Sequence, residues 1–273
     1  MRLALGAVVA LAITAAPASS ATSNRAAGGG AVVATISYVK TNERFRQLRL
    51  KIVRAGSTVV NSPVERLGCR GCDAFRPVAV RVRDLDGGEP EVLLELYTEG
   101  AHCCTVVLVL RYAPAAHTYW SKLLFFGNYG YRLVDLDRDR LPEVVASDER
   151  FVYAYSAYVF STAPPRIWQY RQGRLIDVTR RYPEEIRRSA ARAGKEFLAK
   201  RKPPEDVDLR TYVAVYAADQ YLLGRPEEAR RALDYALAHG FLYSGREYLG
   251  TPAGLNFVAV LMRDLRRWGY RAR

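Results

Sequence analysis

Two segments of the chain repeat one sequence scheme, and this repeat constrains the fold more than any other feature. Each segment has an apolar stretch, an Asp-Leu-Asp turn, a Pro-Glu pair and a second apolar stretch; the two span residues 82–93 and 133–145. Their first aspartates, Asp84 and Asp135, are 51 residues apart (135 − 84), a spacing that suits one four-stranded sheet or blade per repeat. The repeat therefore predicts two similar units, each with an acidic loop between two strands.

Short apolar and β-branched stretches surround the repeat, and turn signals such as Asp86-Gly87-Gly88 and Gln172-Gly173 separate them. The predicted strands cover residues 31–39, 45–53, 78–82, 92–97, 105–112, 120–126, 131–134, 144–146, 151–160 and 167–170. Many short strands with this punctuation predict antiparallel sheets, arranged as a sandwich or as a propeller-like stack.

The hydrophobic period becomes helical after about residue 183. Helices are expected over residues 186–199, from 206 or 208 to 223, from about 226 to 239, and over 253–268. We therefore expect an α+β fold, in which a β-rich domain of residues 31–182 precedes an α-helical region of residues 183–273 that packs against it.

The first 21 residues have the three parts of an export signal. Arg2 is the positive end, Leu3–Ala15 is apolar, and Ala16-Pro17-Ala18 offers small residues for cleavage. A flexible leader is expected over residues 22–30, and no later apolar run is long enough to cross a membrane. The sequence thus predicts a secreted or extracytoplasmic protein of the cell envelope, without a transmembrane segment in the mature chain.

The chain is basic, with 41 Lys and Arg against 28 Asp and Glu and a formal charge of +13. The basic residues are scattered, so they favour a salt-sensitive attraction to anionic polymers over a specific nucleic-acid site. The expected partner is an unknown protein or an envelope polymer, and the oligomeric state stays open.

Four cysteines in an exported chain favour disulfides: Cys69, Cys72, Cys103 and Cys104. Neighbouring residues of a strand point to opposite faces, so Cys103 and Cys104 are expected to seek partners elsewhere. We expect two disulfides that join the 69–72 loop to the 103–104 strand, although the sequence selects no pairing. A zinc site that includes His102 is the alternative.

The second acidic loop has alternating carboxylates that can converge on one hard cation such as Ca²⁺. The predicted ligands are Asp135, Asp137, Asp139 and Glu143. The alternative is that these aspartates cap turns and face Arg138 and Arg140. The first loop is one residue shorter, lacks the third aspartate and is the weaker candidate, because Asp-Gly-Gly is itself a strong turn signal and turn capping is the favoured explanation there. Its carboxylates are Asp84, Asp86, Glu89 and Glu91.

The paired loops resemble the FG-GAP/VCBS repeat family, known from integrin α subunits and secreted bacterial proteins. The loop pattern of that family is matched at its first, third, fifth and ninth positions by Asp135, Asp137, Asp139 and Glu143, whereas Arg140 replaces its glycine. The stretch GAHCC at residues 100–104 is similar to a strand start in uncharacterised exported bacterial proteins. The resemblance covers residues 75–185 and implies a calcium-stabilised β scaffold for adhesion or ligand binding. Two copies predict a partial propeller or a sheet stack.

Catalytic motifs are absent from the sequence: there is no GxSxG, HExxH or Gly-rich phosphate loop. We therefore expect an exported, non-catalytic binding or scaffold protein. The alternatives are a secreted hydrolase of envelope polysaccharide or another polymer, and an adaptor that docks a partner on its helices. Five aromatic residues could form a platform for sugar or could simply pack in the core: Tyr153, Tyr155, Tyr158, Trp168 and Tyr170.

Overall fold

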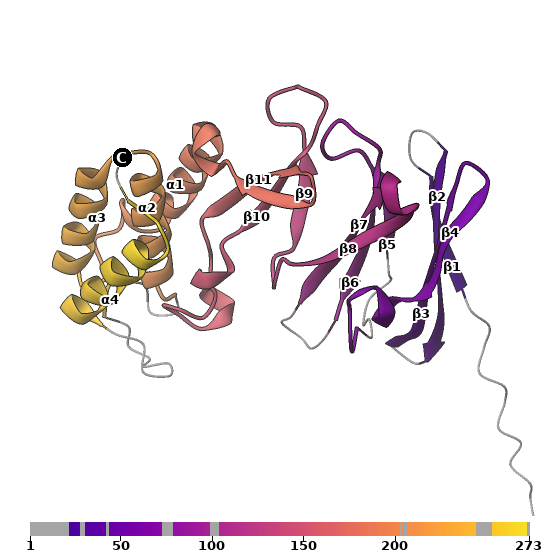
Figure 1. Ribbon diagram of the computed structural model, residues 1–273. Coiled ribbons are helices and arrows are strands. Elements are labelled where there is room, and N and C mark those ends of the chain that lie inside the picture. Colours follow the sequence, from indigo (N-terminus) through magenta and orange to yellow (C-terminus); the bar gives the residue numbers. More distant parts are fainter. Residues whose placement is uncertain are drawn as a thin grey trace, which may run out of the picture.

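The computed structural model describes residues 22–27, 31–41, 44–72, 79–98, 104–202, 204, 207–243 and 253–271; the predicted export signal lies outside them. Three four-stranded antiparallel sheets follow one another along the chain, and four helices come after the third sheet (Figure 1). The α+β class is therefore confirmed. The sheets in the described ranges form no closed propeller, and none of the helices found there is long and apolar enough to cross a membrane.

The first sheet pairs its strands in chain order: β1 Thr22–Ala27, β2 Val32–Thr41, β3 Arg44–Arg54 and β4 Ser57–Pro63. β1 occupies the segment expected as a flexible leader, because its backbone groups pair with the otherwise open edge of β2. The sequence did not predict β4. It follows a two-residue turn in which Ala55 and Gly56 have φ of 47° and 80°, as a tight hairpin requires.

The second and third sheets repeat one topology. The second consists of β5 Ala79–Arg83, β6 Glu91–Tyr97, β7 Thr105–Ala113 and β8 Thr118–Phe125, and the third of β9 Tyr131–Val134, β10 Glu143–Ser147, β11 Pro165–Arg171 and β12 Arg174–Asp177. Each sheet is a meander, and an acidic loop joins its first two strands. The residues that close the two loops correspond, since Arg83 pairs with Glu91 and Val134 pairs with Glu143.

The two central strands of the second sheet, β6 and β7, are buried on both faces. Leu94 and Leu108 pack with the first sheet, whereas Leu93 and Val107 pack with Val144 of the third sheet. Adjacent residues of a strand point to opposite faces, so a strand between two layers must be apolar throughout. This explains the continuous apolar runs at residues 92–94 of β6 and 106–110 of β7.

The helices are α1 Pro183–Phe197, α2 Arg210–Leu222, α3 Pro226–Ala238 and α4 Gly254–Arg267. Short 3-10 turns lie at Val64–Leu67, Pro114–Ala116, Glu149–Phe151, Tyr158–Phe160 and Thr179–Arg181. A strand was predicted over residues 151–160, but two of these turns lie there instead, so that prediction is wrong. Phe151 and Tyr155 are fully buried in the core of the helical region, so tertiary packing decides the conformation of this aromatic segment.

Candidate metal centre

The loop between β9 and β10 brings three carboxylates together. Asp135, Asp137 and Glu143 each offer one oxygen to a cluster whose atoms lie within 4.8 Å of one another. The two aspartates are exposed on the loop, whereas Glu143 begins β10 and is completely buried. The cluster therefore combines a buried carboxylate with two that solvent can reach.

Only one of the two carboxylate oxygens of Glu143 has a hydrogen-bond partner among the described residues. Its Oε2 accepts the backbone N–H of Leu136 at 2.9 Å. Its Oε1 is buried without a hydrogen-bond partner among the described residues. A buried charge without a partner is costly in free energy, so a cation at this position would stabilise the fold.

Asp139, the fourth predicted ligand, lies outside this cluster. Its Oδ1 accepts the N–H of Leu141 at 2.8 Å, and its own N–H is directed at Asp135 Oδ1 at 3.1 Å. Arg138 and Arg140 have φ of 65° and 76°, so the loop keeps a glycine-like curl although arginine replaces glycine. Neither arginine forms an ion pair with the cluster in the part of the chain that the structure describes.

The loop between β5 and β6 has the same arrangement, although it is one residue shorter. Asp84, Asp86 and Glu91 bring their oxygens within 4.8 Å of one another. Glu91 corresponds to Glu143: its Oε2 accepts the N–H of Leu85 at 3.1 Å, and its buried Oε1 has no hydrogen-bond partner within the described ranges. Glu89, which was predicted with this loop, instead pairs with the Arg54 guanidinium.

The two clusters differ in their compensating charge. In the first loop, Arg111 Nη1 lies 3.2 Å from Asp86 Oδ2, and the N–H of Gln172 donates to the same oxygen at 2.9 Å. Burial, and secondarily the Asp86 charge, nevertheless raise the pKa of Glu91 to about 7. The second loop has no such arginine in the described structure, so its carboxylates receive less compensating charge from the protein.

A tyrosine from a later part of the chain lies near each cluster. Tyr182, just before α1, donates its hydroxyl to Asp137 Oδ2 at 3.1 Å. Burial and the neighbouring Glu143 raise the pKa of Tyr182, and burial and Glu91 do the same for Tyr170 of β11. Sequence reasoning missed both tyrosines. Through Tyr182 the second loop contacts the segment before α1, and through the Gln172 N–H the first loop contacts the third sheet.

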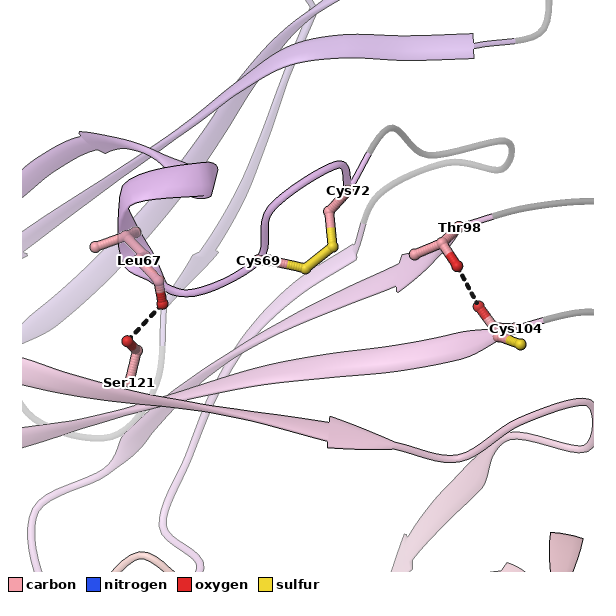
Figure 2. The surroundings of a disulfide bond; sticks show 6 residues. All are labelled: Leu67, Cys69, Cys72, Thr98, Cys104 and Ser121. Carbon is pink, nitrogen blue, oxygen red and sulfur yellow. Dashed lines mark hydrogen bonds between the residues drawn. A yellow bond between two sulfur atoms is a disulfide. The ribbon is translucent and has the colours of Figure 1, made fainter.

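The cysteines correct one prediction. Cys69 and Cys72 form a disulfide with each other, with Cα atoms 5.5 Å apart, so the expected bridges from this loop to the 103–104 strand are wrong (Figure 2). Three residues of separation already place the two cysteines within bridging range. Cys104 is also disulfide-bonded, and its carbonyl accepts the N–H of Thr98 at 3.0 Å. His102 and Cys103 lie outside the described residues.

The predicted aromatic residues do not share one surface. Tyr155 and Tyr170 are buried in different cores. Tyr153 is half exposed and lies beside Tyr158, with ring centroids 5.5 Å apart. Trp168 packs against the core between the second and third sheets.

Two relatives share sequence with the chain. An uncharacterised protein of Sinorhizobium fredii is 29% identical over 203 residues, which cover 74% of this chain and 31% of that protein. A Synechocystis protein named as a probable thylakoid lumen protein is 31% identical over 166 residues, 58% of this chain and 48% of that protein. The chain thus spans less than half the length of these curated relatives. No family profile and no solved structure match it significantly.

Proposed function

We propose that both acidic loops bind a divalent cation, and that the chain is an exported, non-catalytic binding or scaffold protein of the FG-GAP/VCBS type. The observation that carries the proposal is the pair of buried glutamates. Glu91 and Glu143 stand at equivalent positions, and each holds one oxygen without a hydrogen-bond partner among the described residues. Each lies beside two aspartates that offer further oxygens.

Calcium is the cation that this donor set favours. All of the ligands are hard carboxylate oxygens, and Ca²⁺ completes six to eight positions with backbone carbonyls and water in flexible loops. No cysteine or histidine takes part in either cluster, which disfavours zinc.

A bound ion would stabilise the fold and would help to join successive structural units of the chain. It would hold the ends of β5 and β6, or of β9 and β10, together. The contact of Tyr182 with Asp137 would couple the second site to the start of α1. In this interpretation the sheets are blade-like repeats, and a rigid stack of them presents its surface loops to a partner.

Export is supported by the sequence and by one relative. The N-terminal segment has the composition of an export signal, and the Synechocystis relative is named as a probable lumen protein. An extracytoplasmic compartment would also supply the calcium concentrations that weak extracellular sites require.

Thermal unfolding of the mature chain with excess Ca²⁺ and with EDTA tests the proposal. Calcium at a hundred times its Kd adds about 2.7 kcal/mol per site, which raises Tm by roughly 5–11 °C for a chain of this size. Asp137→Asn should lose much of the gain from the second site. Asp139→Asn is the matched control, because Asp139 is in the same loop but outside the cluster. Equal Tm values of the wild type in Ca²⁺ and EDTA would overturn the proposal.

A further inference from the structure

A cavity of about 510 Å³ lies where the third sheet meets the helical region. β11, β12 and the turn at Thr179–Arg181 supply one wall. The C-terminal end of α2 and the residues after α4 supply the other. The cavity shares no lining residue with the two acidic clusters, so it is a separate candidate site.

Four arginines line this cavity, against one carboxylate, that of Asp177. Two of the arginines are held in place by acids: Arg166 bonds to Asp177 at 2.7 Å, and Arg150 bonds through Nε to Asp148 at 2.8 Å. Arg150 and Arg166 remain about one third exposed. Their guanidinium groups are therefore oriented by the protein and still reachable from solvent.

The other two arginines lie in the turn after β12. Arg180 donates to the carbonyls of Tyr221 and Leu222 at 3.1 and 2.6 Å, at the C-terminal end of α2. Arg181 is exposed, and its side chain has no hydrogen-bond or ion-pair partner among the residues that the structure describes. Asp148 and Asp177 pair with Arg150 and Arg166, so it is Arg181 that gives the cavity a positive charge which no described side chain neutralises.

An aromatic surface lies beside these charges. Trp268 lines the cavity and is half-buried. The Arg150 guanidinium is 5.3 Å from the centre of the Trp268 ring and donates to the Trp268 carbonyl at 3.3 Å. The ring is therefore fixed next to the arginines. A ligand with both a charged group and a less polar body requires such a combination of charged and apolar surface.

We propose that this cavity binds a small organic oxyanion of monosaccharide size. Guanidinium groups bind phosphate and carboxylate oxygens with the same paired geometry. Arg181 and the exposed edges of Arg150 and Arg166 bind the anionic group, and the body of the ligand packs against Trp268. The ligand class is thus a sugar or similar ring that carries a phosphate or a carboxylate.

Isothermal titration calorimetry with glucose 6-phosphate, glucuronate and uncharged glucose tests this proposal. At least one of the two anions should bind saturably and glucose should not; the anion that binds identifies the charged group. Arg181→Gln should weaken binding about tenfold or more, the size expected for one charge-assisted hydrogen bond. The Arg181 side chain is exposed and has no partner in the described structure, so the variant should fold normally.

Arg132→Gln is the matched control. Arg132 is exposed, its side chain has no described partner, and it lies on β9, at the opposite edge of the sheet from β12. The control should bind like the wild type. Absence of saturable binding by both anions, or equal weakening by the two variants, would overturn the proposal.

Discussion

Asp219 in α2 is fully buried, and neither of its carboxylate oxygens accepts a hydrogen bond with acceptable geometry from a described residue. Burial therefore raises the pKa of Asp219 well above its usual range, and Ser189 and Arg192 of α1 offset only part of this effect. An aspartate in the unfolded chain ionises near pH 3.9. Between that pH and its folded pKa, the folded chain holds a proton that the unfolded chain has lost.

The sign of the pH dependence follows from this difference. The contribution of Asp219 is fully present below its unfolded pKa and is lost as the pH rises through its folded pKa. In that window the free energy of unfolding falls by about 1.4 kcal/mol per pH unit because of this one group. The Asp219→Asn variant has no ionisable group at this position, so its free energy of unfolding does not fall in this way. Its stability relative to the wild type should therefore increase as the pH rises.

Urea unfolding of both proteins in EDTA, from about pH 5 to pH 8, measures this difference. Subtracting the two curves cancels the other titrating groups and the constant cost of exchanging the carboxyl for an amide. We expect a slope of up to about 1.4 kcal/mol per pH unit in favour of Asp219→Asn. A difference that does not change with pH would refute the assignment of a protonated Asp219 in the folded chain.

Three further changes test the packing. Cys69→Ser with Cys72→Ser should cost about 2 kcal/mol in urea unfolding, because the bridge closes a loop of only four residues; a loss near 4 kcal/mol would instead fit a bridge across a long loop. Leu94→Ala should cost about 3–5 kcal/mol, since Leu94 is completely buried between the first two sheets, and a loss below about 1 kcal/mol would contradict that position. Gly127→Ala should lower Tm, because Gly127 has φ of 52° and an added β-carbon would overlap the Glu149 carboxylate; an unchanged Tm would contradict this geometry.

Much of the fold could be predicted because its strands and helices have strong local signals. β9 has the predicted bounds, and the meanders follow from short strands with clear turns. The predictions of secondary structure fail where tertiary contacts decide the conformation of a segment. The alternating aromatic residues of 151–160 suggest a strand, but Phe151 and Tyr155 pack into the helical core. β1 depends on pairing with β2, which its small polar residues do not reveal.

The candidate site could be predicted only in outline. The acidic loops and their correspondence are visible in the sequence, but the choice among carboxylates depends on side-chain direction. Glu89 pairs with Arg54, 35 residues earlier in the chain, and Asp139 caps its own loop. Counting positions in a motif does not reveal such competing partners. The cavity arginines are still harder to find, because distant segments bring them together.

Calcium stoichiometry tests the central claim most directly, since the claim assigns one ion to each buried glutamate. Calorimetric titration of the mature chain with CaCl₂ should give two sites per chain. Glu91→Gln and Glu143→Gln should each retain one site, because each change removes the negative charge from only one cluster. A wild-type chain that binds no calcium, or variants that both titrate like the wild type, would contradict the account.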